Sequence, residues 1–600
     1  MQNNTTLPTI LQEELPHLQK TRLALQPLHG KQHMRGEGGV GKEVTFLMMW
    51  MPVRRVGAHC HNYLESIQPG LSRKVFAGVI ASSVIFHLTV RGYRYYRARQ
   101  TVRERGDAAR EACENLRKML EEEGPVDEQR EEAIVSLSMK DLQQKLRKGE
   151  LTAVEVLRAY QRKALKAHAE LNCLTEPIWE AEAIAVELDL LRPNQRKPLH
   201  GIPVSVKDSL FLEGYDCHAG LQALAFQAVD RDADVIQVLK SQGAVPFVRT
   251  NFPQGLMTYA CSNPMYGKTV NPHNPKRGPG GSSGGEGALL GAGGSVIGIG
   301  SDIGGSIRIP TQMCGVYGLK PTVDRIATAG IDPLESGQSL VRVAVGPMAR
   351  DMGGLIEVTQ ALLMHRMYSI NPYVPPVPFN ELLFEKETPM RVGYYTRLEG
   401  AQPHPTCVRA IMEAKQALEA RGHTVVEFQP PRPLECACDF FMGAVFADDG
   451  ESTNKYLKDD VLDDSVTTSY YYGKLPRPVR YIIGSLIQLF AYKREFTEAW
   501  QKKKLDAVIG PLMPFPALTS GTEDKVLAGY LPVTKVTEED IEKLKDPTVY
   551  PLTGSLEKHV KKDSEGSVGL PMGVQCIALP YQEEVVLRLM QEIDSAIRGS

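Results

Sequence analysis

The sequence predicts an α/β protein in which a large twisted, mixed β-sheet is covered by helices on both faces. From about residue 135 onward, short apolar runs typical of strands alternate with amphipathic helical segments. Such alternation is typical of a sheet with helices on both sides. A chain of 600 residues with 42% hydrophobic and 23% charged content also has enough apolar side chains for a large core.

The composition excludes several classes of protein. The net charge of −2 argues against a general nucleic-acid-binding protein, which usually carries a large excess of basic residues. The ten cysteines are scattered, and only Cys436 and Cys438 lie close together. One intervening residue is poor spacing for zinc ligands and for a disulfide. We therefore expect a reduced, cytosol-facing protein with no metal and no cofactor.

Residues 1–74 predict a poorly ordered leader, because they show little hydrophobic periodicity. The stretch 36–42 matches the spacing of a P-loop. However, Glu43 stands where that loop needs a hydroxyl group for magnesium, and no strand-like segment precedes it. Phosphate binding is therefore not expected in the leader.

Residues 75–96 predict a single transmembrane anchor. The run 75–90 contains no Asp, Glu, Lys or Arg and is close to the length of a bilayer span. Tyr93, Tyr95 and Tyr96 follow at the depth expected for lipid headgroups, and several arginines lie beyond them. The aromatic-belt and positive-inside rules then place the downstream chain in the cytoplasm. A buried core helix and a late signal peptide are the alternatives.

The next segments lead into the globular part. Residues 97–134 are highly charged, and we expect an exposed linker helix there. Ser138 and Thr152 each stand three residues before an acidic residue, which is the spacing of a capping box. Two helices should begin at these positions, with Gly149 ending the first of them.

Strand-like and helical segments then alternate. The apolar runs 201–206 and 244–248 predict strands, and between them 232–242 has its apolar residues on one helical face. Near the C-terminus, 573–579 is again extended, and a last amphipathic helix follows it. We assign these segments to one catalytic domain, 135–600.

Two glycine-rich turns that each present serine carry the chemistry. The first is 280–285, Gly-Gly-Ser-Ser-Gly-Gly, and the second lies within 301–310, Ser-Asp-Ile-Gly-Gly-Ser-Ile-Arg-Ile-Pro. Glycine allows the backbone to approach a ligand closely. Two such turns predict that hydroxyls and backbone N–H groups meet at one reacting atom, as in an acyl-transfer site.

A serine nucleophile needs a base to remove its proton. His218 and His273 are the nearest histidines, but neither fits a Ser-Asp-His order. The spacing at 281–285 matches a nucleophile elbow, yet prolines rather than a strand precede it. Lys207 directly follows a predicted strand and should project from the sheet end into a cleft. A desolvated lysine can be neutral and act as a base.

Lys207, Ser282 and Ser306, with the glycines around them, resemble the amidase signature family. The matching stretch is 280–310, and a match of this length is highly specific. The resemblance implies a Lys–Ser–Ser triad in which Lys207 is the base, Ser282 the proton relay and Ser306 the nucleophile. Ser306 would attack an amide carbonyl while its proton passes through Ser282 to Lys207. The same route would return a proton to the departing nitrogen.

The other residues of the two turns should shape this site. Asp302 and Arg308 would fix the second turn by ion pairing, and Ser283 would support the lysine or the loop. The relay serine of the family lies in a cis peptide, which the glycines around Ser282 could accommodate. Backbone N–H groups of the second turn would stabilise the oxyanion. The expected oxyanion and substrate-binding set is Ile303, Gly304, Gly305, Ser306, Leu256 and Ser282.

Further matches, at 243–248, 318–322, 346–351 and 568–576, are similar to the fatty-acid amide hydrolase branch of this family. This resemblance covers about 135–598. It implies a membrane-bound homodimer that hydrolyses fatty-acid ethanolamides and primary amides, with membrane lipid as a second partner. The endoplasmic reticulum or another endomembrane would be its location.

The segment 475–490 matches the membrane-binding cap of that branch. Its basic ends and one apolar face suit a helix that lies in a membrane interface, whereas an ordinary amphipathic core helix is the alternative. The residues of the apolar face are Ile482, Ile483, Leu486, Ile487 and Phe490.

Three departures from the family keep other functions open. The cap is shorter than usual, and most of a core stretch is missing between Pro516 and Val533. The pair Leu256-Met257 stands where a methionine and an aromatic residue are usual. One alternative keeps the chemistry and changes the substrate, as in an amidase for small amides or an amidotransferase-type glutaminase. The other is an inactive or misfolded amidase-like protein.

Overall fold

The computed structural model forms two compact units, residues 1–88 and 89–600. The predicted leader 1–74, the cap segment 475–490 and the stretch 516–533 lie wholly or largely outside the described residues. The structure describes residues 73–122, 124, 127–331, 341–397, 402–436, 455–472, 486–513, 531–546, 550, 558, 560–562 and 564–598.

Helix α4 (Arg73–Glu122) contains both the predicted anchor and most of the charged linker. No helix within the described ranges is both long enough and apolar enough to cross a bilayer. The expectation that 97–134 is exposed is wrong for one face of α4. Apolar side chains recur there every three or four residues and form an amphipathic stripe. Its buried members are Ala98, Val102, Ala109, Cys113, Leu116 and Leu120.

The helices after α5 (Glu128–Ser136) begin at the predicted caps. The Ser138 hydroxyl accepts a hydrogen bond from the third N–H group of α6 (Met139–Lys148). Gly149 ends this helix with a φ of 74°. A positive φ favours glycine at this position. The Thr152 hydroxyl caps α7 (Ala153–Leu171) in the same way.

The first sheet is mixed, as predicted, with strand order β1-β3-β2-β6-β8-β7. Its central strand β2 pairs in parallel with β3 and β6, whereas β1, β8 and β7 run antiparallel to their neighbours. The strands are β1 (Leu174–Pro177), β2 (Pro203–Lys207), β3 (Val245–Thr250), β6 (Ile297–Asp302), β7 (Tyr317–Gly318) and β8 (Ala344–Ala349).

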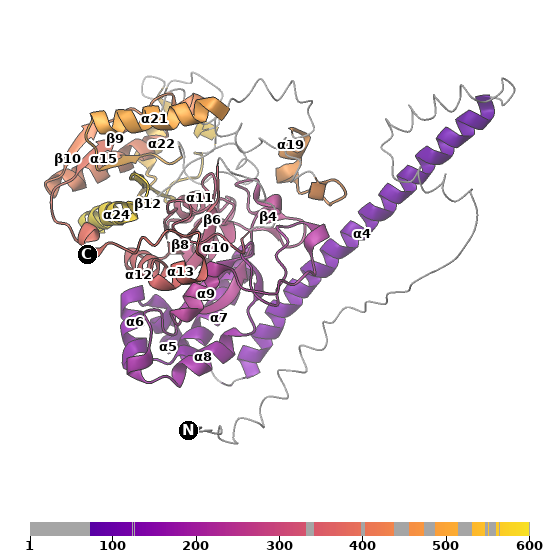
Figure 1. The fold of residues 1–600 in the computed structure, drawn as a ribbon, viewed down its shortest axis with the longest axis horizontal. Coiled ribbons are helices and arrows are strands. Elements are labelled where there is room, and N and C mark those ends of the chain that lie inside the picture. The colour runs from indigo at the N-terminus through magenta and orange to yellow at the C-terminus, as the bar shows by residue number, and fades with distance from the viewer. Residues whose placement is uncertain are drawn as a thin grey trace. The chain divides into compact units, whose positions relative to one another are not determined.

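The prediction of one large sheet is wrong, because the described strands form two large sheets and a short pair. Among the described strands, β7 is the edge of the first sheet and pairs with β8. The second sheet has the order β10-β9-β11-β13-β12, and α15 and α24 pack against it (Figure 1). The remaining strands are β4 (Ser262–Asn263), β5 (Gly267–Lys268), β9 (Arg391–Tyr394), β10 (Thr424–Glu427), β11 (Ala507–Gly510), β12 (Leu531–Lys535) and β13 (Pro571–Ile577).

Helices cover both faces of the first sheet. Gly298 of β6 faces α10, because a Cβ atom there would collide with the Glu286 carboxylate. Its neighbour Ile297 instead contacts Gly354 of α12. Successive strand residues point to opposite faces, so α10 and α12 lie on opposite sides of the sheet.

The remaining helices vary widely in length, and the labelled ones can be followed in Figure 1. They are α8 (Ala181–Asp189), α9 (Asp234–Ser241), α10 (Gly284–Gly291), α11 (Arg308–Cys314), α12 (Met352–Leu362), α13 (His365–Ile370), α14 (Glu381–Phe384), α15 (Pro405–Ala420), α16 (Pro433–Glu435), α19 (Asp464–Tyr472), α21 (Leu486–Lys502), α22 (Glu538–Lys545) and α24 (Glu583–Arg598).

Candidate active site

Lys207 lies where the carboxyl ends of three parallel strands meet. It is the last residue of β2, and the ladder pairs it with Thr250 at the end of β3. On the other side of β2, strand β6 ends with Ser301 and Asp302. The carboxyl ends of parallel strands are a common position for ligand sites. The sheet therefore brings residues that are distant in sequence to one edge.

The Lys207 side chain is fully buried and contacts two hydroxyl groups. Its Nζ atom lies 2.7 Å from Ser282 Oγ and 2.9 Å from Ser301 Oγ. Only the neutral amine can accept a proton, and removal from water favours the uncharged form of a lysine. The structure thus brings together the predicted base and relay. It also adds Ser301, a residue for which the sequence carried no separate indication.

The first glycine turn holds Ser282 against the lysine. The Gly281–Ser282 peptide bond is cis, as the family resemblance implies. Gly280 has a φ of 81°, a left-handed conformation that favours glycine. A Cβ atom on Gly281 would lie 2.8 Å from the Thr258 carbonyl oxygen. A larger residue at either position would therefore displace the turn that presents Ser282.

The second turn carries Ser306 beside the first. The Ser283 N–H donates to the Ser306 carbonyl at 3.0 Å, and the Ser283 hydroxyl donates to the Ser301 carbonyl at 3.4 Å. Ser283 therefore supports the loops rather than the lysine. Ser306 itself is half-buried. Its hydroxyl makes no hydrogen bond to Ser282 within the described residues, and such catalytic contacts often tighten only when substrate binds.

Asp302 organises the second turn. Its carboxylate accepts hydrogen bonds from the backbone N–H groups of Gly305 at 2.8 Å and Ile307 at 3.1 Å. The Arg308 Nε–H group donates a third hydrogen bond to it at 3.0 Å. Burial would raise the pKa of Asp302, but the Arg308 charge and these hydrogen bonds outweigh it and hold the pKa well below its ordinary value. The carboxylate is therefore a permanently charged anchor for the loop.

The backbone N–H groups of the second turn differ in their hydrogen-bond partners. The Gly305 N–H donates to Asp302 in this structure, and its role as an oxyanion donor stays a prediction. The N–H groups of Ile303, Gly304 and Ser306 have no partner in the described part of the chain. The Tyr259 hydroxyl donates to the Gly304 carbonyl at 3.1 Å and orients that peptide. N–H groups without a partner in a loop of this kind are available to a developing oxyanion, and the expected donor set of Ile303, Gly304, Gly305 and Ser306 stays a prediction.

The expected substrate contact Leu256 lies in the loop that leads to the first turn. Its φ of 57° follows a φ of 63° at Gly255, and a left-handed leucine is a strained feature of the kind found at functional sites. Its side chain packs with Ala219 and Leu457 in an apolar cluster. The structure does not bring Leu256 into contact with the triad, and its contact with substrate stays a prediction.

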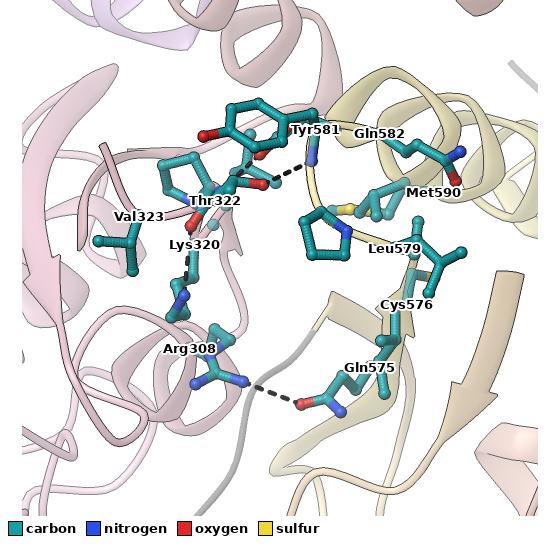
Figure 2. Close-up of a pocket in the computed structure, with 18 of the residues that line it drawn as sticks. Arg308, Lys320, Thr322, Val323, Gln575, Cys576, Leu579, Tyr581, Gln582 and Met590 are labelled. Atoms are coloured by element: carbon teal, nitrogen blue, oxygen red, sulfur yellow. Dashed lines mark hydrogen bonds between the residues drawn. The ribbon is translucent and has the colours of Figure 1, made fainter. Parts of the chain in front are cut away.

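A cavity of about 600 Å³ lies next to the second turn. Arg308 donates to Gln575 at 3.3 Å, and Figure 2 shows this bond with Lys320 on the same side of the cavity as Arg308. None of the three predicted triad residues is among the described residues that line it. Because Arg308 also pairs with Asp302, one guanidinium connects this cavity to the loop that carries Ser306.

The sequence and the site can now be compared with known proteins. The Amidase family model matches residues 155–587, which include Lys207, Ser282 and Ser306. The chain belongs to the amidase family. It is 36% identical over 509 residues to fatty-acid amide hydrolase 1 of Sus scrofa, covering 77% of this chain and 86% of that protein.

Other relatives are similar to this chain in sequence over comparable lengths. Identity to fatty acid amide hydrolase 1 of Caenorhabditis elegans is 36% over 550 residues, covering 84% of this chain and 94% of the relative. The acetamidase of Emericella nidulans is 30% identical, with coverages of 77% and 89%. A solved fatty acid amide hydrolase structure matches this amidase with a TM-score of 0.68 at 25% identity, covering 85% and 95%. The resemblance inferred from the sequence is confirmed, and this amidase is an enzyme.

Proposed function

We propose that this amidase hydrolyses fatty-acid amides, namely N-acylethanolamines and primary fatty amides, through Lys207, Ser282 and Ser306. The observation that carries the chemistry is the 2.7 Å contact between buried Lys207 Nζ and Ser282 Oγ, next to the turn that holds Ser306. The 36% identity to two fatty-acid amide hydrolases supports the class of substrate.

The acylation step follows from this geometry. Neutral Lys207 accepts the proton of the Ser282 hydroxyl, and Ser282 accepts the proton of Ser306 as Ser306 Oγ attacks the amide carbonyl. The carbonyl oxygen becomes negatively charged, and backbone N–H groups of the second turn donate to it. Loss of one such donor typically costs about 3–4 kcal/mol of transition-state stabilisation.

Departure of the amine needs the proton that Lys207 accepted in the acylation step. An amine anion is a poor leaving group, so the Lys207 ammonium returns its proton through Ser282 to the nitrogen while the C–N bond breaks. Water then attacks the Ser306 ester and loses its proton along the same route. The acid is released, and all three side chains return to their first state.

The nucleophile is tested with a fluorophosphonate probe, which forms a bond to an activated serine. We expect labelling of the wild-type enzyme and none of Ser306→Ala. For Lys207→Ala, we expect a larger loss of turnover on an amide than on the matched ester, because only the amide needs a protonated leaving group. Labelling that survives in Ser306→Ala, or equal losses on both substrates, would contradict these roles.

A membrane location is the second part of the proposal. Helix α4 exposes large apolar side chains where the anchor is predicted, including Ile85 and Leu88, which are 64% and 63% exposed. Exposed apolar groups of this kind mark contact surfaces. We place the catalytic part on the cytoplasmic side of an endomembrane, as a homodimer.

Vesicle flotation tests this location. The full chain should float with phospholipid vesicles, whereas the double variant Ile85→Ser/Leu88→Ser should float less and keep its activity on a water-soluble amide. Equal flotation of both proteins would contradict an anchoring role for α4. Light scattering of the detergent-solubilised enzyme gives its mass and tests the dimer.

Hydrolysis of small amides is the second candidate, favoured by the 30% identity to an acetamidase. The kcat/KM values for a long-chain and a short-chain acyl amide distinguish the two. Preference for the short chain would end the fatty-acid proposal while leaving the triad intact. Well-folded wild-type enzyme that takes up no fluorophosphonate would instead support an inactive amidase-like protein.

A further inference from the structure

A buried carboxyl group lies beside Lys207 and has no role in the steps above. Glu286 of α10 is fully buried. The Ser205 hydroxyl donates to its Oε2 atom at 2.6 Å, and the Thr250 hydroxyl donates to its Oε1 atom at 2.8 Å. In the described part of the chain, the carboxylate has no cation within ion-pair distance. A buried acid of this kind is costly when charged.

The strands that hold Glu286 also hold Lys207. Ser205 stands two residues before Lys207 on β2, so both side chains lie on the same face of the sheet. Thr250 is the ladder partner of Lys207 on β3. On β6, Gly298 leaves open the space that the Glu286 carboxylate fills. Three neighbouring strands therefore enclose the acid next to the base.

The charged state of Glu286 depends on few groups. Burial raises the pKa of Glu286 to about 7, and the hydroxyls of Ser205 and Thr250 together with the charge of Lys207 limit that rise. Among the described residues, Cys173, which precedes β1, also interacts electrostatically with Glu286, and burial keeps the pKa of this thiol far above neutrality. Lys207 is thus the group whose charge Glu286 can influence.

We infer that Glu286 is a positioning residue that sets the charge of Lys207. Its protonated form leaves Lys207 as the neutral amine, whereas its carboxylate stabilises an ammonium that cannot accept the Ser282 proton. The two forms have the same net charge and differ only in which group holds one proton, so the pair titrates as a unit. This inference rests on the proposed function, because it concerns the base of that reaction.

A purely structural role is the alternative, in which Glu286 only ties α10 to the sheet. The rate at a single pH does not distinguish the two roles, because any substitution in a tightly packed site can slow the reaction. The pH dependence of Ser306 activation does, because a structural tie has no effect on when Lys207 loses its proton. The rate of fluorophosphonate labelling, measured from pH 5 to pH 10, reports this step without an amide substrate.

Glu286→Gln is the first variant. Glutamine has nearly the same shape but never becomes negative, so the Lys207 ammonium loses its stabilisation and gives up its proton at lower pH. We expect the acidic limb of the labelling profile to move to lower pH by about one unit. An unchanged limb in folded Glu286→Gln, or a shift to higher pH, would overturn the inference.

Thr250→Val and Thr250→Ser form a matched pair that does not alter the carboxyl itself. Valine has the shape of threonine but lacks the hydroxyl that stabilises the Glu286 carboxylate. The acid then stays protonated to higher pH, and the acidic limb should again move to lower pH. Serine keeps the donor and should retain the wild-type profile. This pair decides the question if Glu286→Gln does not fold, and equal profiles for both variants would overturn the inference.

The outcomes also separate this inference from the proposed function. Absence of labelling in folded wild-type enzyme refutes the Ser306 mechanism itself. Normal wild-type labelling together with an unmoved acidic limb in the variants refutes only the role of Glu286. Thermal unfolding, monitored by circular dichroism, establishes that each variant is folded before its labelling profile is interpreted.

Discussion

Two serine hydroxyl groups lie within hydrogen-bond distance of the Lys207 amine and determine which protons it can exchange. Ser282 connects it to the nucleophile, whereas Ser301 contacts the same Nζ atom at 2.9 Å from the end of β6. Ser301 has no place in the proton route. Its contact instead restricts the rotation of a long, flexible side chain, so that the amine points toward Ser282.

Ser301→Ala tests this positioning. A net contribution of about 1 kcal/mol for one hydrogen bond corresponds to a fall of about fivefold in kcat/KM for amide hydrolysis. Ser301→Thr keeps the hydroxyl and should remain near wild type. Equal activities of the alanine and threonine variants, at unchanged melting temperatures, would show that the contact does not orient Lys207.

Burial of the His404 ring makes the stability of the fold depend on pH. Its Nδ1 atom accepts the Thr406 N–H at 3.1 Å and caps α15. Burial lowers the pKa of His404 to about 4, whereas the unfolded ring titrates near about 6.5. The folded ring thus stays neutral where the unfolded one binds a proton. Its contribution to stability is complete above the unfolded pKa and is lost as the pH falls toward 4.

His404→Asn removes this titration and keeps a good capping residue. Between pH 6.5 and pH 5.5, we expect the free energy of unfolding of wild type to fall by about 1 kcal/mol more than that of His404→Asn. Urea unfolding at the two pH values measures both changes. Equal changes would mean that the folded ring is protonated in the same range as the unfolded one.

At the scale of elements, α4 is joined to the first sheet by a buried network of charges. Arg105 is 4% exposed, and its guanidinium contacts Glu176 at 2.6 Å and Asp216 at 3.0 Å. Arg249 of β3 pairs with the same Glu176 and also with Asp208, the residue after Lys207. The helix that carries the predicted anchor is therefore connected to the strand that ends at the base.

Arg105→Met leaves the buried Asp216 and the partly buried Glu176 without one of their partners. Removal of one member of a buried ion pair typically costs about 3–5 kcal/mol, and we expect a loss of this size in chemical denaturation. Arg103→Ala is the matched control. Arg103 lies two residues away, with its side chain 84% exposed and paired with Asp107, so its replacement should cost less than about 1 kcal/mol. Similar losses for both variants would contradict a special role of the buried network.

At the scale of the whole catalytic part, a second charge cluster joins the two sheets. Arg325 follows β7 of the first sheet and is buried. Its guanidinium pairs with Glu583 and Glu584, the first two residues of α24. Carboxylates at the start of a helix also interact favourably with its dipole. This cluster therefore fixes the helix that covers the second sheet to the body that holds the triad.

Arg325→Met should loosen the second sheet before the first. The two glutamates lose their partner, so α24 and β13 should open more readily than β2 and β6. Native-state hydrogen exchange measures these local free energies separately. Arg342→Ala removes an exposed pair with Asp324 and should change neither sheet. A uniform loss of protection in both sheets would show that the cluster acts only on global stability.

Local features of the fold were predictable where neighbouring residues cause them. Caps such as Ser138 and Thr152 act within one helical turn, and β2 forms from neighbouring residues with two valines among them. The buried stripe of α4 was missed because its small apolar residues are surrounded by many arginines and glutamates. The number of sheets was also missed, because it depends on how far each edge strand pairs with a distant segment.

The sequence by itself determined the two serine-bearing glycine turns, their spacing and the strand that ends at Lys207. These features depend on the conformational freedom of glycine and on local hydrophobic patterning, which act over a few residues. Only the tertiary structure decided which groups meet at the lysine. Ser301 of β6 contacts its amine, Thr250 of β3 is its ladder partner, and Glu286 of α10 is hydrogen-bonded to Thr250. Strand order together with close packing across Gly298 brings these groups to one place. Such contacts join positions far apart in the chain, and no local pattern encodes them.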